Sequence, residues 1–556
     1  MRLLNLVLLI SPALTATALP TVQFGSSKIL GASFSNVEFF GGIPYAEPPV
    51  GQLRLRSPVL LNSIPTAVLQ AQKFGPSCLQ NELPPDQVSE DCLTLNVFRP
   101  ANTNSNTKLP VMVWIFGGDE LASFLVGGSS FYNATNLVEY SVKRNTPVMV
   151  VSINYRVGPL GFPQGIEAGQ AGTEVLNVGL QDSIAALQWI QNNIAKFGGD
   201  RSKVTLVGQS SGAFTINVLL RNKKFAGLAR AAILESIVAL PTFEPDRNEP
   251  TWQQYVSQIP GCETASQTNS TIACVRNASS NDVLQAMTKA NLTFGSFAFF
   301  QPVLDGPGGL ISDRQSQIQP NQLGLPVMIG TNLDEGTAFA PQVGASEEAI
   351  VGFLQEESTP PLSFITPAAQ SNAINQILTL YPDIPALGSP FGTGNNTFGL
   401  SSQYKRFAAI IGDLAMQSVR RTFTQKASAA GNKVFAYLFT DPSGSVIPEL
   451  IFTPTAPGSL GVPHSSEVSL IFGNLANRSP AAVLLSTVMQ DYWLSFVTSL
   501  SPNDNSGFTS RPKWEQYTSD SQLLLQLNSQ RTDMTPDTFR KQQISFIQQN
   551  VDALHL

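Results

Sequence analysis

The chain has 556 residues, with 33 basic and 39 acidic side chains and a formal net charge of −6 at pH 7. This mildly acidic balance contains no basic block, which argues against nucleic acid as a partner. Because 42% of the residues are hydrophobic, the chain can bury a large core and does not fall in the disordered class.

Residues 1–18 have the features of a secretory signal peptide. Arg2 precedes an apolar core at 3–10, and small residues follow up to Ala18. This core is too short to span a bilayer and no later stretch is long and apolar enough, so we expect no stable membrane insertion. The mature chain should begin near Leu19 and be secreted. No linker or repeat divides it, so we expect one domain over residues 19–556.

The cysteines and the glycosylation motifs agree with a secreted chain. The four cysteines are Cys78, Cys92, Cys262 and Cys274. Pairing of sequence neighbours would close two short loops, as suits an oxidising compartment, whereas the spacings do not fit a zinc site and no metal is expected. Six N-x-[ST] sequons occur, at Asn133, Asn269, Asn277, Asn291, Asn395 and Asn477. Three of them crowd beside the second cysteine pair, which predicts an exposed, glycosylated segment.

Strand and helix patterns alternate along the chain. Many prolines and glycines at 41–51 predict a rigid, non-helical surface segment. Continuous apolar runs at 109–116 and 148–154 are typical of central parallel strands covered on both faces, and 180–194 has a helical pattern. This alternation predicts an α/β fold with a mostly parallel sheet, whose functional sites lie at the carboxyl ends of the strands.

Residues 197–212, FGGDRSKVTLVGQSSG, predict a nucleophile. A buried-strand pattern at 204–207 is followed by G-x-S-x-G and then by a helix-compatible run at 213–220. The glycines permit a cramped turn that would expose the Ser210 hydroxyl at the sheet edge, and the helix start would direct N–H groups at an oxyanion. Because a bare G-x-S-x-G also arises by chance, its meaning depends on the rest of the chain.

A serine nucleophile needs a base and an acid that orients the base. The chain has two histidines. His555 is the penultimate residue, where chains usually fray, so we expect it to be idle and take His464 as the candidate base. After an apolar strand pattern, residues 330–337 offer two adjacent carboxylates as the acid, Asp334 and Glu335. Either would give the chain order nucleophile, acid, base.

Over nearly the whole mature chain the sequence resembles the type-B carboxylesterases, the α/β-hydrolase group that includes cholinesterases and some secreted fungal lipases. Residues 197–212 resemble the serine signature of that family, and 90–100 resemble its second signature, around the first disulfide. Residues 42–51, 154–158 and 177–182 also match in place and order. The resemblance implies an α/β-hydrolase fold with a mostly parallel central sheet flanked by helices, and with helical cap insertions.

The resemblance also implies the chemistry. It makes the chain a serine esterase that hydrolyses a small-molecule ester through an acyl-enzyme, without a cofactor. Ser210 would be the nucleophile, His464 the base and Glu335 the acid, with Asp334 as second candidate. Arg54 and Glu90 would form a buried ion pair that ties the early strand to the cysteine loop, the alternative being two surface charges.

The oxyanion hole is where the sequence departs from the family. The N–H of Ser211 should be one donor, and Gly118 another. The family has a Gly-Gly-Gly turn here, whereas this chain has Gly-Gly-Asp. Either Asp119 takes the third place, or a short insertion gives it to Ser123. Gln209 stands where the family often has glutamate, which removes one charge beside the nucleophile.

The first cysteine loop bears on the substrate. Residues 79–91 contain no aromatic side chain, whereas cholinesterases carry a tryptophan there that holds the quaternary ammonium by cation–π contact. Choline esters are therefore not expected. The related lipases use a longer loop as a helical lid, so a short loop with two prolines favours small to medium apolar esters over triglycerides. Four phenylalanines offer either an acyl-pocket wall or ordinary core: Phe294, Phe297, Phe299 and Phe300.

Two alternatives remain at this stage. The family includes adhesion members, similar to neuroligins, that keep the fold without catalysis, and the altered glycine turn is the feature that supports this interpretation. Acyl transfer to an alcohol other than water would use the same residues. The natural ester and the oligomeric state are not determined by the sequence.

Overall fold

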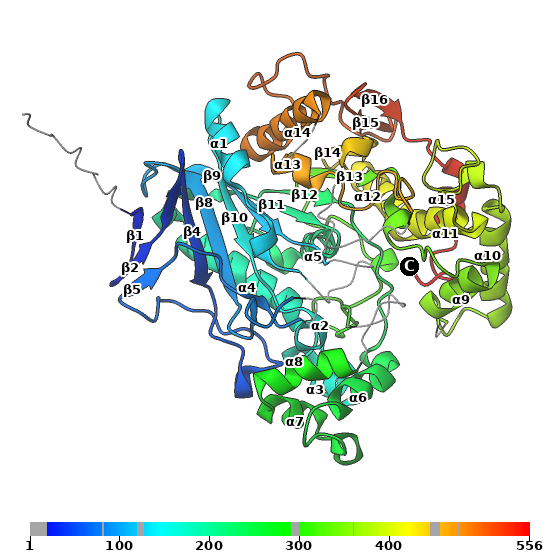
Figure 1. Cartoon of the computed structure of the whole chain (residues 1–556), viewed down its shortest axis with the longest axis horizontal. Coiled ribbons are helices and arrows are strands. Elements are labelled where there is room, and N and C mark those ends of the chain that lie inside the picture. The colour runs from blue at the N-terminus through cyan, green and yellow to red at the C-terminus, as the bar shows by residue number, and fades with distance from the viewer. Residues whose placement is uncertain are drawn as a thin grey trace, which may run out of the picture.

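The computed structural model describes residues 19–80, 83–118, 127–290, 300–359, 361–444, 456–475 and 479–556. Its central feature is an 11-stranded sheet (Figure 1). In chain order its strands are β3 (Ala32–Phe34), β4 (Val37–Pro44), β8 (Thr94–Pro100), β9 (Leu109–Ile115), β10 (Met149–Ile153), β11 (Gly199–Gln209), β12 (Ala231–Glu235), β13 (Val327–Asn332), β14 (Val434–Phe439), β15 (Leu523–Leu527) and β16 (Asp533–Pro536). In space the order is β16-β15-β14-β13-β12-β11-β9-β10-β8-β4-β3.

From β10 across to β15 each strand runs parallel to its neighbour. Antiparallel pairing occurs only towards the edges of the described sheet, at β8, β4 and β3 on one side and at β16 on the other. The prediction of a mostly parallel sheet is therefore confirmed. A three-stranded sheet of β1 (Thr21–Phe24), β2 (Ser27–Leu30) and β5 (Val68–Gln70) lies beside it, and β6 (Ser77–Cys78) pairs with β7 (Val88–Ser89).

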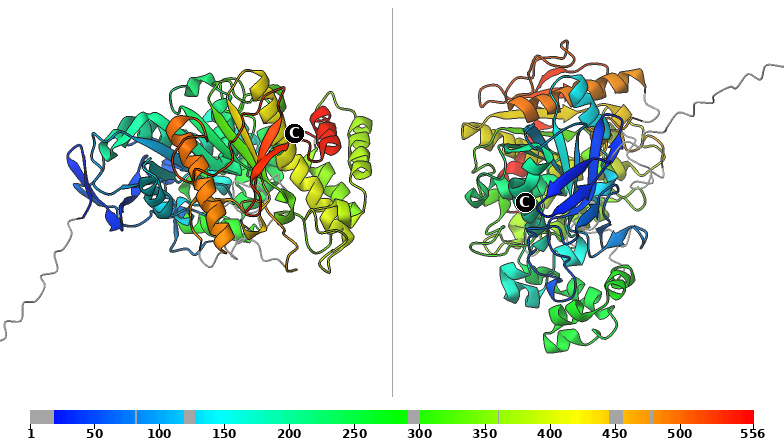
Figure 2. Two further views of the ribbon diagram at one scale, coloured as in Figure 1. Left: turned by 90° about the horizontal axis from the view of Figure 1, so that it is seen from above. Right: turned by 90° about the vertical axis from the view of Figure 1, so that its left-hand side faces the viewer.

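Helices flank this sheet. They are α1 (Thr135–Lys143), α2 (Gly158–Gly161), α3 (Ile166–Ala171), α4 (Val178–Asn193), α5 (Ser211–Leu220), α6 (Glu249–Ser257), α7 (Thr271–Asn277), α8 (Ser280–Lys289), α9 (Glu347–Glu357), α10 (Pro367–Leu380), α11 (Ser402–Gly412), α12 (Ser418–Ala429), α13 (Val468–Ile471), α14 (Pro480–Ser499) and α15 (Lys541–Gln549). Helices α3, α6, α7 and α8 gather at one end of the molecule (Figure 1 and the right-hand view of Figure 2), and α9, α10 and α15 form a second group (Figure 1 and the left-hand view of Figure 2). These two groups are the candidates for the helical insertions that the family resemblance implies.

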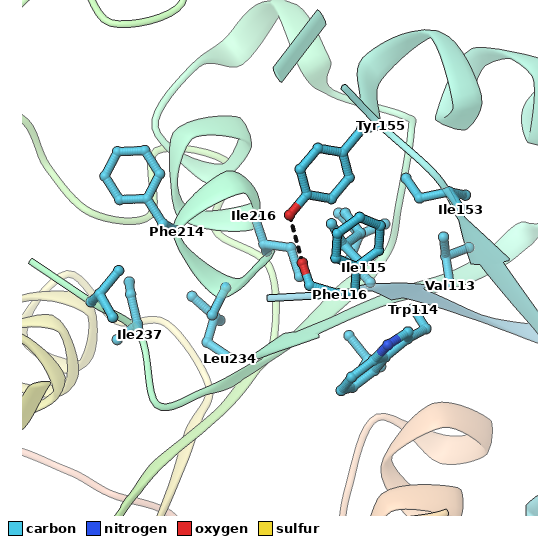
Figure 3. Packing of buried hydrophobic residues seen from close by; sticks show 14 of the residues in the cluster. Val113, Trp114, Ile115, Phe116, Ile153, Tyr155, Phe214, Ile216, Leu234 and Ile237 are labelled. Carbon is cyan, nitrogen blue, oxygen red and sulfur yellow. Dashed lines mark hydrogen bonds between the residues drawn. The ribbon is translucent and has the colours of Figure 1, made fainter. Parts of the chain in front are cut away.

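The central strands are apolar throughout because both faces of the sheet are covered. On β9, Trp114 points to the opposite side of the strand from Ile115 (Figure 3). The Trp114 ring packs against Phe472, next to α13, with ring centroids 4.9 Å apart. On the other face, α5 lies over β9 and β11. A strand buried on both faces shows no alternation in sequence, which is why the run at 109–116 is continuous.

Strand β11 is longer than the run at 204–207 predicts. It begins at Gly199, which pairs with Leu109 on β9, and the register shifts before pairing resumes at Val204, while the polar side chains at 200–203 are partly or fully exposed. Apolar patterning marks only the buried part of a strand, so the polar extension was not visible in the sequence.

The first cysteine loop is tied down covalently and electrostatically. Disulfides join Cys78 to Cys92 and Cys262 to Cys274, so the pairing of sequence neighbours is confirmed. Arg54 meets Glu90 in a two-pronged ion pair, with Nε–Oε1 and Nη2–Oε2 distances of 2.5 and 2.7 Å, and both side chains are 3% exposed. The buried pair predicted from the family resemblance is therefore present, and the surface alternative is wrong.

The sequons within the described residues all stand at the surface. Asn133, Asn269, Asn277 and Asn395 have exposed side chains, as glycosylation requires. Asn291 and Asn477 lie outside the described residues, as do Phe294, Phe297 and Phe299. Phe300 is buried against Trp252 and Tyr255, which places it in the core.

The carboxyl-terminal end does not fray as the sequence suggested. His555 is buried, and its ring packs on Phe243 with a centroid distance of 4.1 Å. The neighbouring Leu554 is also buried. Apolar burial of the last residues therefore overrides the usual disorder of a chain end. Within the described part of the chain, no helix combines the length and the apolar character that a membrane crossing needs.

Helix α5 can approach β9 so closely only because residue 212 is glycine. A Cβ on Gly212 would lie 2.1 Å from the carbonyl oxygen of Ile115, a backbone atom. We predict that Gly212→Ala forces α5 away from the sheet and destabilises the fold by about 3 kcal/mol or more. Gly352→Ala on α9 is the matched control, because the space around it is open. That change should stabilise the protein by about 0.5–1 kcal/mol. Urea unfolding of both variants measures these changes. A urea midpoint for Gly212→Ala equal to that of the wild type would contradict the predicted clash.

Candidate active site

Ser210 occupies the sharp turn between β11 and α5. Its φ of 56° and ψ of −123° lie outside the regions that residues with a side chain favour. Its N–H donates to the carbonyl oxygen of Glu235 at 2.9 Å, and its own carbonyl accepts from the N–H of Phe214 at 2.9 Å. The predicted order of strand, tight turn and helix is thus observed. The side chain, however, is fully buried, whereas the sequence predicted an exposed hydroxyl.

His464 and Glu335 form a buried pair. The Nδ1 atom of His464 lies 2.6 Å from Oε2 of Glu335, and both residues are nearly inaccessible to solvent. The other carboxylate oxygen, Oε1, accepts from the hydroxyl of Ser236 at 2.6 Å and from the N–H of Asn332 at 2.7 Å. These bonds fix the carboxylate, which in turn holds the proton on Nδ1 and leaves Nε2 as the acceptor.

Asp334, the alternative acid, points elsewhere. Its carboxylate accepts from the Ser389 hydroxyl and the Phe391 N–H at 2.8 Å each, and from the N–H of Val462 at 2.9 Å. Burial raises the pKa of Asp334 to about 6, against those hydrogen bonds, which lower it. Asp334 therefore fastens the loop that carries His464, and Glu335 is the carboxylate that reaches the imidazole.

The Nε2 atom of His464 makes no hydrogen bond to the Ser210 hydroxyl in the described structure. It lies 2.9 Å from Nε2 of Gln209, whose amide group is also 2.7 Å from the Ser465 hydroxyl. Within the described residues, the Ser210 hydroxyl has no hydrogen-bond partner. The structure thus brings the predicted acid and base together, but the side chain of Gln209 contacts the Nε2 atom that the nucleophile would need.

One of the predicted oxyanion donors, the N–H of Gly118, is also engaged. The N–H of Gly118 donates to the Ser211 hydroxyl at 2.7 Å. Position 117 must be glycine, because a Cβ there would lie 2.5 Å from the carbonyl oxygen of Gln209. Asp119 and Ser123, the two candidates for the third donor, lie outside the described residues. In the sequence, the signal for these contacts is that polar residues, Gln209 and Ser211, stand on both sides of Ser210.

Two further carboxyl groups lie behind the pair and were not predicted. Asn332 Nδ2 donates to Glu467 Oε2 at 2.6 Å, and Trp493 Nε1 donates to Glu235 Oε1 at 2.7 Å. Burial raises the pKa of Glu467 to about 7, with a further contribution from the charge of Glu335. Burial also raises the pKa of Glu235 well above its ordinary value. Burial thus favours the neutral form of both carboxyl groups, which lowers the negative charge near the imidazole.

Residues 18–547 match the model of the Carboxylesterase family. The chain belongs to this family. Lipase 2 of Geotrichum candidum is 32% identical over 580 residues, which cover 95% of this carboxylesterase and 95% of that protein. A secreted triacylglycerol lipase of Gibberella zeae is also 32% identical, over 98% of this chain and 92% of that protein. Among solved structures, Aspergillus niger EstA is similar with a TM-score of 0.81 at 26% identity, over 97% of this chain and 99% of that chain.

Family membership and the central sheet settle two of the expectations from sequence. The carboxylesterase has the α/β-hydrolase fold, and it is a carboxylic ester hydrolase. The matches extend over nearly the whole chain, as the resemblance of several separate motifs indicated.

The buried Glu467 predicts a specific dependence of stability on pH. Because its pKa is raised in the folded state, its favourable contribution is complete below the unfolded value of about 4.5 and is lost as the pH rises through about 7. The variant Glu467→Gln lacks this titration. Its melting temperature should therefore fall less than that of the wild type between pH 4.5 and 8. Glu244→Gln, at an exposed position, is the control and should follow the wild type. If the melting temperatures of Glu467→Gln and the wild type changed with pH in the same way, the raised pKa of Glu467 would be refuted.

Proposed function

We propose that this carboxylesterase is a secreted serine esterase that cleaves small to medium apolar esters through an acyl-enzyme. Ser210 acts as nucleophile, His464 as base and Glu335 as acid. The proposal rests above all on the 2.6 Å contact between His464 Nδ1 and Glu335 Oε2. Ser210 follows Gln209, whose side chain touches His464, so the hydroxyl and the imidazole belong to one buried region.

The reaction uses only groups of the protein and water. The Ser210 oxygen attacks the ester carbonyl carbon while its proton passes to Nε2 of His464, and the N–H groups of Ser211 and Gly118 stabilise the oxyanion. The imidazolium then protonates the leaving alkoxide, and the alcohol departs. Water attacks the acyl-enzyme with His464 again as base, which releases the carboxylic acid and restores the serine. Glu335 stabilises the imidazolium in both halves and stays ionised.

The first cysteine loop supports short substrates. Its disulfide, the β6–β7 pairing and the Arg54–Glu90 ion pair hold it in place. The Gln80 side chain also bonds both the N–H and the carbonyl oxygen of Gly127 at 2.9 Å. A loop held at so many points is poorly suited to swing aside as a lid. Triglyceride hydrolysis is the second candidate, because the relatives from Geotrichum and Gibberella are named lipases.

Secretion and domain organisation are part of the proposal. Residues 1–18 would be removed as a signal peptide, and 19–556 would form one domain. The disulfides, the exposed sequons and relatives named as secreted lipases support secretion. The buried apolar side chains form one contiguous cluster from Val22 to Leu554, which supports a single domain.

Hydrolysis of p-nitrophenyl esters from acetate to palmitate tests the chemistry. Ser210→Ala should lower kcat by at least about 1,000-fold, because the acyl-enzyme cannot form. Ser371→Ala, on the exposed side of α10, is the matched control and should keep full activity. Turnover by Ser210→Ala above a few per cent of the wild-type rate would show that Ser210 is not the nucleophile.

The chain-length profile separates the two substrate classes. An esterase should be fastest on short to medium acyl chains and show no jump in rate when tributyrin exceeds its solubility. A maximum on long chains together with such a jump would favour the lipase alternative.

A further inference from the structure

The two residues that flank the nucleophile each carry a hydrogen-bonding side chain, and each side chain engages a group that catalysis needs. The Gln209 amide contacts Nε2 of His464, and the Ser211 hydroxyl accepts a hydrogen bond from the N–H of Gly118. We propose that Gln209 is a positioning residue that holds the site in a self-bonded resting state and must withdraw from His464 before Ser210 can react. This inference rests on the proposed function of the site.

The competition is for a single lone pair. A neutral imidazole has one acceptor nitrogen, and with Nδ1–H directed at Glu335 that acceptor is Nε2. The Gln209 amide donates to it at 2.9 Å, so the Ser210 hydroxyl cannot donate there at the same time. This agrees with a buried Ser210 hydroxyl that has no partner in the described structure.

Two hydrogen bonds hold the Gln209 side chain, and a glycine beside it leaves room for the amide oxygen. One amide N–H reaches His464, the other reaches the Ser465 hydroxyl at 2.7 Å, and the amide oxygen lies where a side chain on Gly117 would be, 2.6 Å from the ideal Cβ position. Gly117 therefore makes room for the amide. Because the hydrogen bonds satisfy both N–H groups, the contact with His464 is a built arrangement rather than a chance approach.

The hydrogen-bond network decides the orientation of the amide. With the oxygen turned towards Nε2, the imidazole would need a proton on that atom while Nδ1 still faced the carboxylate, so the ring would have to be charged. With the nitrogen turned towards Nε2, the neutral ring satisfies both contacts. In the resting enzyme Gln209 thus favours the neutral imidazole, which is the form that acts as base.

The Ser211 hydroxyl adds a second contact of the same kind. It accepts from Gly118 N–H at 2.7 Å, so an oxyanion must displace the hydroxyl to use that donor. Substrate binding is then expected to break two hydrogen bonds, one on each side of Ser210. A charged oxyanion is a stronger hydrogen-bond acceptor than a hydroxyl, so the oxyanion should displace the Ser211 hydroxyl from the N–H of Gly118.

The test compares Gln209→Met with the wild type. Methionine keeps the length of the side chain and removes both amide N–H groups, so His464 is released. We expect kcat/KM for p-nitrophenyl acetate and the rate of inactivation by a small organophosphate to rise about 10-fold, which corresponds to 1.4 kcal/mol. The acidic limb of the pH–rate profile should move to higher pH, because the bond that favoured the neutral ring is lost.

Three further variants make the result specific. Gln188→Met, on the exposed side of α4, should behave as the wild type. Ser465→Ala removes one anchor of the amide and should raise the rate by a smaller factor, and it serves if Gln209→Met does not fold. Gln209→Glu can accept from a charged imidazole but cannot donate to a neutral one, so its acidic limb should move furthest towards high pH.

Two results would overturn the inference. If Gln209→Met and Ser465→Ala fold, and their rates and pH profiles equal or fall below those of the wild type, Gln209 supports the site without restraining the base. A crystal structure of the organophosphate adduct with the Gln209 amide still on His464 would do the same. Failure of the proposed function is distinct, because then the wild type itself would show no turnover that Ser210→Ala abolishes.

Discussion

The site depends on the close approach of α5 to the end of β9. Glycine at 212 lets the helix start almost in contact with the Ile115 carbonyl, and the turn between β11 and α5 is therefore sharp enough to hold Ser210 at a positive φ. This conformation is strained, and the cover of apolar side chains on both faces of the sheet maintains it. The nucleophile is thus positioned by backbone packing more than by bonds of its own side chain.

Charge in the interior is arranged around the imidazole. Glu335 accepts from two donors and contacts His464, whereas Asp334 next to it binds the loop that carries the histidine. Burial raises the pKa of the nearby Glu467. Carboxyl groups so close together could not all be ionised without a large cost. The environment therefore gives adjacent acidic residues different tasks, although the sequence shows them as equivalent.

The hydrogen bonds of Gln209 and Ser211 join the turn that carries the nucleophile to His464 and Gly118. In an apolar interior, groups poised for catalysis do not remain unpaired unless the packing enforces it, as it does for the Ser210 hydroxyl. The resting site meets this demand with side chains from the same turn as the nucleophile. The family resemblance marks position 209 as variable in charge, but the contact that Gln209 makes arises from residues 255 positions apart in the chain.

The sequence by itself determined the α/β architecture, because apolar runs such as 109–116, which are typical of covered parallel strands, alternate with helical patterns such as 180–194. It also determined the turn at Ser210, since G-x-S-x-G between a strand and a helix needs glycine for local steric reasons. Only the tertiary structure decided which of Asp334 and Glu335 faces His464, that the serine is buried, and that His555 packs into the core. Local patterns fix local backbone, whereas the partner of a side chain depends on elements that meet only when the sheet assembles.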